Sequence, residues 1–250
     1  MPGPEPLEIP KETPPVVPRP QGLLQRLYRE EWDAWRAHYR RYFKLAARAL
    51  ALGFILGFVY FMTRPAQEKK ALAFVMKSLK DIPLGASPLV LALTLFYHNA
   101  RASVIAVAAG VVPLACLPVL DPLANGATLG LLASISKHQG LNVPLLFLKS
   151  VAPHGIFELP AVLYATSVGI YLSLTLGKLA KEAWRKRGGR EPQGSEAPPS
   201  AEGFLESQAA RADDDAGDLA GKVVRSFVLV VLPLLLIAAI IEACITPLLR

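Results

Sequence analysis

Apolar residues gather in long blocks along the chain instead of spreading evenly. The stretch from Ile82 to Ser136 contains only two charged residues, Arg101 and Asp121, whereas a soluble domain carries about one charged residue in four. Further apolar runs cover Leu45–Met62, Leu159–Gly177 and Ser226–Ile241. Because an apolar helix of about 20 residues crosses a bilayer, the pattern predicts an all-α, polytopic membrane protein built as a helical bundle.

The longest apolar run is too long for one span and about right for two. A break at Gly110 and Pro113 would place Arg101 and Asp121 at similar depth, where they could form an ion pair. A break at Asp121 and Pro122 would instead make Asp121 a loop residue. The five predicted spans, with the first break, are Leu45–Met62, Pro88–Ala109, Pro113–Ile135, Leu159–Gly177 and Ser226–Ile241.

Polar segments divide the chain around these spans. We expect a disordered Pro-rich tail (1–20), a basic amphipathic helix rich in aromatic residues (21–44), a membrane domain (45–183), a polar cytoplasmic linker (184–222) and a last transmembrane helix (223–250). The tail is either a spacer or a partner-binding segment. The helix over 21–44 suits the headgroup region of a membrane or a contact with another subunit. A second amphipathic helix is expected over 67–82, and a loop or re-entrant piece over 137–152.

Composition and charge fit this picture. The chain is 52% hydrophobic and has a net charge of +7, with a mean hydropathy of +0.36. Basic residues gather on the cytoplasmic flanks of membrane spans, so the arginines before Leu45 and the basic cluster after Gly177 place the N-terminus in the cytoplasm and the C-terminus outside. We expect the lipid bilayer and membrane or envelope proteins as partners, and no nucleic acid; a homo-oligomer stays open. Cys116 and Cys244 lie in apolar runs and predict neither a disulfide nor a metal site.

Three ionisable residues lie at the edges of apolar runs, where charge is costly. His154 and Glu158 are four residues apart, a spacing that puts both on one face of a helix. Glu242 interrupts the last apolar stretch. The five-span topology brings all three to the outer face of the membrane. They could form a proton relay, a metal site or a general acid/base pair. Alternatively, Glu158 caps the N-terminus of its own helix, with Pro160 in the first turn and His154 beside it.

Several polar and small residues fall inside the central apolar run. Asn99 and Arg101 precede the first break, and Asn125, Gly126 and Gly130 follow it. Glycines four residues apart allow two helices to approach closely, and asparagine can form a hydrogen bond across such a contact. These residues therefore predict either close helix packing or, together with His154, Glu158 and Glu242, a functional polar cluster.

The sequence lacks the common catalytic signatures. It contains no H-E-x-x-H zinc motif, no other stretch that supplies three metal ligands, and no G-x-S-x-G nucleophile motif. We therefore expect no catalytic residue, no metal and no cofactor, and we expect that the protein is not an enzyme.

One stretch is distinctive as a motif: Pro153-His154-Gly155-Ile156-Phe157-Glu158-Leu159-Pro160-Ala161. Together with Asn99, the Asn125-Gly126 pair with Gly130, and the closing stretch from Ala238 through Glu242 to Pro247, it resembles the stage II sporulation protein M family. The resemblance covers roughly Leu45 to the C-terminus. It implies a multi-spanning protein of the cell envelope, and the named member in spore formers acts with peptidoglycan-degrading partners during engulfment of the forespore. The resemblance brings no catalytic residues with it.

These observations lead to one expected function and two alternatives. We expect a non-enzymatic scaffold or assembly partner in cell-envelope remodelling, located in the cell membrane. The first alternative is a membrane subunit of a transporter or permease, suggested by Asn99, Arg101 and Asp121 inside apolar helices. The second is an intramembrane hydrolase.

Overall fold

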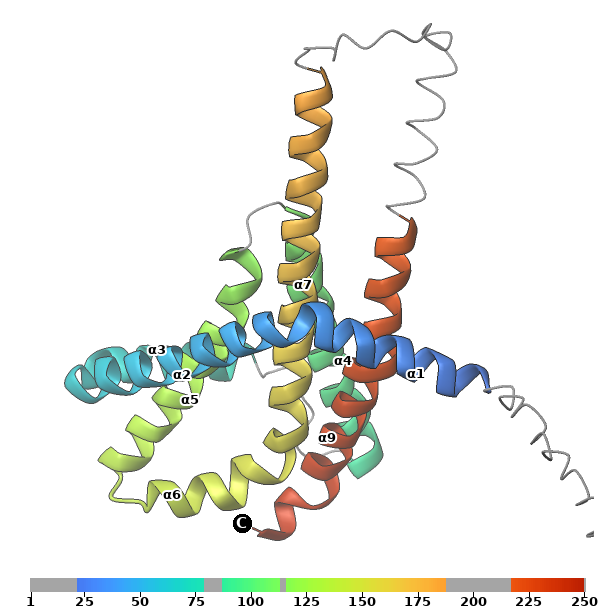
Figure 1. The fold of residues 1–250 in the computed structure, drawn as a ribbon. Coiled ribbons are helices and arrows are strands. Elements are labelled where there is room, and N and C mark those ends of the chain that lie inside the picture. The colour runs from blue at the N-terminus through green and yellow to red at the C-terminus, as the bar shows by residue number, and fades with distance from the viewer. Residues whose placement is uncertain (1–21, 79–86, 113–115, 188–216, 250) are drawn as a thin grey trace, which may run out of the picture.

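A computed structural model describes residues 22–78, 87–112, 116–187 and 217–249. These residues form helices joined by short turns, with no strand among them (Figure 1). The elements are α1 (Leu23–Ala34), η1 (Trp35–Tyr39), α2 (Arg40–Thr63), α3 (Pro65–Ser78), α4 (Pro88–Ala108), η2 (Ala109–Val111), α5 (Cys116–His138), α6 (Val143–Leu146), η3 (Phe147–Val151), α7 (Ala152–Arg187), η4 (Phe227–Val231), α9 (Leu232–Cys244) and η5 (Thr246–Leu249). The tail predicted over 1–20 and most of the linker predicted over 184–222 lie outside the described residues.

The first helix runs without interruption from Leu23 to Thr63, through α1, η1 and α2. The amphipathic helix and the span predicted separately from the sequence are thus one continuous helix, drawn in blue in Figure 1. It contains no proline, so its hydrogen-bond ladder can continue. It ends at Arg64, which has φ −137° and ψ 72°, because the residue before a proline is driven out of the helical region.

The break in the central apolar run lies between Val111 and Cys116. The short 3₁₀ turn η2 ends α4, and Val112 adopts an extended conformation. Asp121 and Pro122 lie inside α5. The break at Gly110 and Pro113 therefore agrees with the structure, and the alternative break at Asp121 is wrong.

Helices α2 and α5 pack closely along each other, with glycines from both at the contact. A Cβ atom placed on Gly53 would lie 2.1 Å from the carbonyl oxygen of Leu123, and one on Gly126 would lie 2.1 Å from that of Leu50. Gly130 meets α2 in the same way one turn further on. Gly126 and Gly130 thus lie at the contact with α2, whereas α5 touches α4 only slightly.

The centre of the molecule is formed by α7, which packs against α4 and α9 and also reaches α2 and α5. Its middle stretch carries small residues, and Ala161, Ala165 and Val168 are at most 1% exposed. Gly169 of α7 faces Gly110, where an added Cβ would meet a carbonyl oxygen at 2.1 Å. Small residues at these positions let helix backbones approach closely, which is how helices gain packing energy in a membrane.

Within the described residues, four helices are long and apolar enough to cross a membrane: Leu23–Thr63, Pro88–Val111, Val143–Glu182 and Gly217–Cys244. The third begins with α6 and η3, so the piece predicted over 137–152 is mostly helical. The predicted span Pro113–Ile135 corresponds to α5, which is not among the four. Asp121, Pro122 and Asn125 lie within α5 and lower its hydropathy.

Candidate functional site: a histidine and carboxylate cluster between α7 and α9

His154 and Glu158 lie near the beginning of α7 and face the same side of it. The helical spacing brings His154 Nε2 to 4.0 Å from Glu158 Oε2, with side-chain exposures of 15% and 28%. The helix has already begun at Ala152 and continues through Pro160. Glu158 therefore lies inside α7 and does not cap it. The prediction of a new helix that holds Pro160 in its first turn is wrong.

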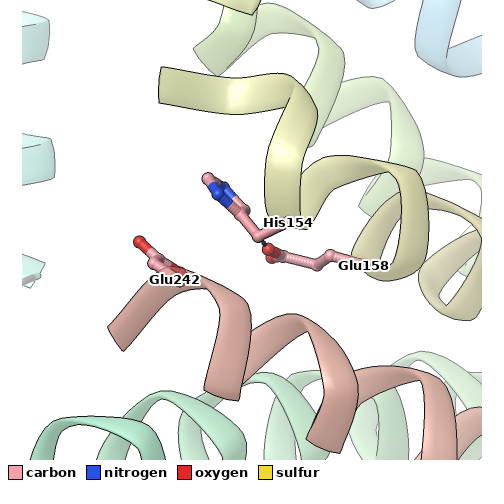
Figure 2. Close-up of side chains that lie close together, drawn as sticks. All are labelled: His154, Glu158 and Glu242. Carbon is pink, nitrogen blue, oxygen red and sulfur yellow. Dashed lines mark ion pairs between the residues drawn. The ribbon is translucent and has the colours of Figure 1, made fainter. Parts of the chain in front are cut away.

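Glu242 completes the cluster from the other side. It lies near the end of α9, and one ligand atom from each of His154, Glu158 and Glu242 lies within 4.8 Å of the other two. Figure 2 shows the two α7 side chains and Glu242 facing one another across the gap between the helices. The third potential ligand thus comes from a residue that is distant in the sequence, which is why no local metal motif appears there.

A cavity of about 730 Å³ lies beside the cluster. His154 and Glu242 form part of its wall, together with Asn142, Lys149 and Ser150, and the remaining lining residues are leucines and Val151. The cluster is therefore half-buried against apolar side chains but reachable from a cavity large enough for water and a small ligand.

A short π-helical segment directly precedes the cluster of His154, Glu158 and Glu242. The five residues of η3, Phe147–Val151, lead into α7. Short π-helical segments are rare and often occur at functional sites, but η1 and η4 are π-helical as well, so η3 alone does not mark the site. Gly155 is not required for space, since a Cβ atom there would have its closest contact at 3.6 Å, with Val151. Pro153 and Pro160 both lie within α7, and Pro247 lies in η5.

The other predicted site residues lie elsewhere. Asn99 is half-buried and Arg101 is exposed on α4. In the described part of the chain Arg101 forms no ion pair, so the predicted pairing with Asp121 is not present. Asn125 Nδ2 instead lies 3.5 Å from Asp121 Oδ2 on the same helix. The fold therefore brings together three of the six candidate residues and leaves Asn99, Arg101 and Asn125 outside the cluster.

A second polar network, which was not predicted from the sequence, surrounds Glu31. This residue is 3% exposed, and its carboxylate accepts hydrogen bonds from Tyr164, from Ser226 at 2.6 Å and from Arg225 Nε at 3.1 Å. The Ser226 hydroxyl also lies 3.2 Å from that of Tyr39. The network joins α1 to α7 and to the start of the last helix. Arg225, a charge directly before the last apolar run, was the available signal, because a charge at such a position needs an acidic partner.

A third polar contact anchors α3. Glu68 is 8% exposed, and one of its oxygens accepts a hydrogen bond from Ser134 Oγ at 2.6 Å and lies 2.9 Å from His138 Nδ1. The serine hydroxyl is directed at the carboxylate and not at the imidazole, so it is not set up as a histidine-activated nucleophile. The contact joins α3 to the end of α5.

The fold and the site together define a class of protein. The described residues form a helical bundle with four helices that could cross a membrane, and a cluster of one histidine and two glutamates lies between two of these helices. A family profile described as Stage II sporulation protein M matches residues 46–247. The chain therefore belongs to the stage II sporulation protein M family. No curated protein and no solved structure matches it.

Proposed function

We propose that this membrane protein is a non-enzymatic assembly partner in cell-envelope remodelling. The proposal follows from membership of the stage II sporulation protein M family, whose named member acts with peptidoglycan-degrading partners. The helical bundle would contact other envelope proteins through its lipid-facing helices and through the end that carries His154, Glu158 and Glu242.

The packing at the centre of α7 is the observation that carries the proposal. Thr166, Ser167 and Val168 are at most 1% exposed, and Gly169 is in close contact with α4 and η2. A transporter needs a substrate site that opens to each side in turn near the middle of the membrane. Of the three polar residues that suggested transport, Arg101 is exposed, and Asn99 and Asp121 are half-buried. A tightly packed centre favours a binding role over a transport role.

We further propose a five-span topology that includes α5, with the N-terminus in the cytoplasm. The basic residues Lys178, Lys181 and Arg185 lie near the C-terminal end of α7, and His154 lies at its other end. Because basic flanks stay in the cytoplasm, the cluster of His154, Glu158 and Glu242 would lie at the outer side of the membrane. There it would face the compartment that contains peptidoglycan.

The test combines an activity assay with a binding assay. The purified full-length protein, incubated with isolated peptidoglycan, should release no soluble fragments, and Glu158→Gln should behave in the same way. Tagged protein in its native membranes should co-purify with a peptidoglycan-degrading enzyme. Release of fragments that is abolished by Glu158→Gln would overturn the non-enzymatic proposal. Failure to associate with any such enzyme would overturn the assembly role.

A further inference from the structure

We propose that His154, Glu158 and Glu242 bind a divalent transition-metal cation of the Zn²⁺ kind. The cation would link α7 to α9 at the end of the bundle beside the cavity. This inference goes beyond the proposed function, because the site would exist whichever partners the protein has.

The ligand set is the first argument. One imidazole nitrogen and two carboxylates suit Zn²⁺ and related transition metals, whereas Ca²⁺ and Mg²⁺ prefer oxygen ligands alone. Zn²⁺ sites with three protein ligands commonly keep a fourth position for water. The cavity lined by His154 and Glu242 lies beside the cluster and could supply that water.

The geometry is the second argument. Ligands about 2.1 Å from a tetrahedral cation lie roughly 3.4 Å apart. The three ligand atoms here lie within 4.8 Å of one another, and His154 Nε2 lies 4.0 Å from Glu158 Oε2. Small side-chain rotations would therefore bring the three ligand atoms to the separation that a tetrahedral cation requires. Two of the ligands lie one helical turn apart on α7, and the third comes from a neighbouring helix, as in metal sites built within helical bundles.

The charge balance is the third argument. Two carboxylates that approach closely in half-buried surroundings repel each other unless a cation or a proton lies between them. Lys149 also lines the adjoining cavity, but within the described residues it forms no ion pair with Glu158 or Glu242. A divalent cation would neutralise both carboxylates at once and would hold the two helices together.

The test measures Zn²⁺ binding to the full-length protein in detergent micelles after removal of metals with a chelator. We expect about one tightly bound Zn²⁺ per chain that excess Ca²⁺ does not displace. Glu242→Gln and Glu158→Gln should each weaken Zn²⁺ binding at least about tenfold. Mutation of a residue that only orients a metal ligand already lowers metal affinity by about tenfold or more, and removal of the ligand itself should cost at least as much. Glu68→Gln is the matched control, because it alters another carboxylate in contact with a histidine, and it should leave the binding unchanged. Lys149→Gln should leave it unchanged or strengthen it.

A second measurement uses only the wild-type protein and therefore does not depend on the folding of the variants. Co²⁺ bound to the wild-type protein should show the visible absorption of a four-coordinate site, and Zn²⁺ should displace it. The proposal is overturned if the wild-type protein binds no Zn²⁺, or if binding is equally strong in Glu242→Gln and in the wild type. Neither result depends on partner proteins, so this test can fail while the assembly role stands.

Discussion

The hydroxyl of Tyr164 donates a hydrogen bond to the buried carboxylate of Glu31, 133 residues earlier in the chain. This contact fixes the N-terminal helix against the centre of α7. It also shows how the chain accommodates a carboxylate that is only 3% exposed, since Ser226 and Arg225 supply further donors.

Replacement of Glu31 should destabilise the bundle strongly. Glu31→Ala leaves the donors of Tyr164, Ser226 and Arg225 without their shared acceptor, and removal of one partner from a buried ionic network typically costs about 3 kcal/mol. Glu30 also contacts Arg225, at 2.8 Å, but its side chain is 37% exposed. Glu30→Ala should therefore cost less than about 1 kcal/mol. Unfolding of the two variants in mixed micelles measures the difference, and equal losses would show that the network does not hold α1 in place.

The contact between α2 and α5 should not tolerate even one added methyl group. In Gly126→Ala the new Cβ would lie 2.1 Å from the Leu50 carbonyl oxygen, so the helices must separate, at a cost of about 1–3 kcal/mol. Gly221 has nothing within 4 Å of an added Cβ. Because alanine favours a helix over glycine by about 1 kcal/mol, Gly221→Ala should be neutral or stabilising. The thermal stability of the two purified variants provides the comparison, and an unchanged Gly126→Ala would contradict the packing described.

Loss of the Glu68 carboxylate should loosen α3. Glu68→Ala removes the contacts with Ser134 and His138, which join α3 to α5. Trypsin should then cleave faster after Lys69, Lys70 and Lys77, because local opening exposes the backbone. Gln67→Ala alters an exposed neighbour and serves as the control. Identical cleavage rates in the two variants would mean that these hydrogen bonds do not anchor the helix.

The proposed orientation predicts the behaviour of reporter fusions. Alkaline phosphatase joined after Leu249 should be active, because the enzyme folds only outside the cytoplasm, and green fluorescent protein at the same place should be dark. Fusions after Arg187 should give the reverse pattern, since this point follows the basic end of α7. Active phosphatase after Arg187 would invert the topology and would place the cluster of His154, Glu158 and Glu242 at the cytoplasmic side.

The helical class could be predicted from the sequence because hydropathy is a local property. The break predicted at Gly110 and Pro113 was also visible locally, as one of two alternatives. The one continuous helix from Leu23 to Thr63 was not predicted. The sequence is amphipathic before Leu45 and uniformly apolar after it, and this change in composition suggested two separate elements although the helical backbone continues.

The candidate site was only partly predictable. The spacing of His154 and Glu158 places both on one helical face, and the topology indicated Glu242 as a neighbour. The partner of a side chain on another helix depends on tertiary packing, which hydropathy does not encode. For this reason Arg101 appeared to need Asp121, which it does not contact, and the contact between Glu31 and Arg225 was missed.

The most direct test of this account asks whether α7 and α9 bring Glu158 and Glu242 together in a membrane. Cysteines would replace both residues in a protein that carries Cys116→Ala and Cys244→Ser, and a short bismaleimide would be added to native membranes. A control pair at positions 158 and 185 lies about 40 Å apart along one helix, at ~1.5 Å per residue. Mass spectrometry should detect a cross-linked peptide joining positions 158 and 242 and none joining 158 and 185. Absence of the 158–242 link, with both cysteines reactive toward a single maleimide, would contradict the central cluster.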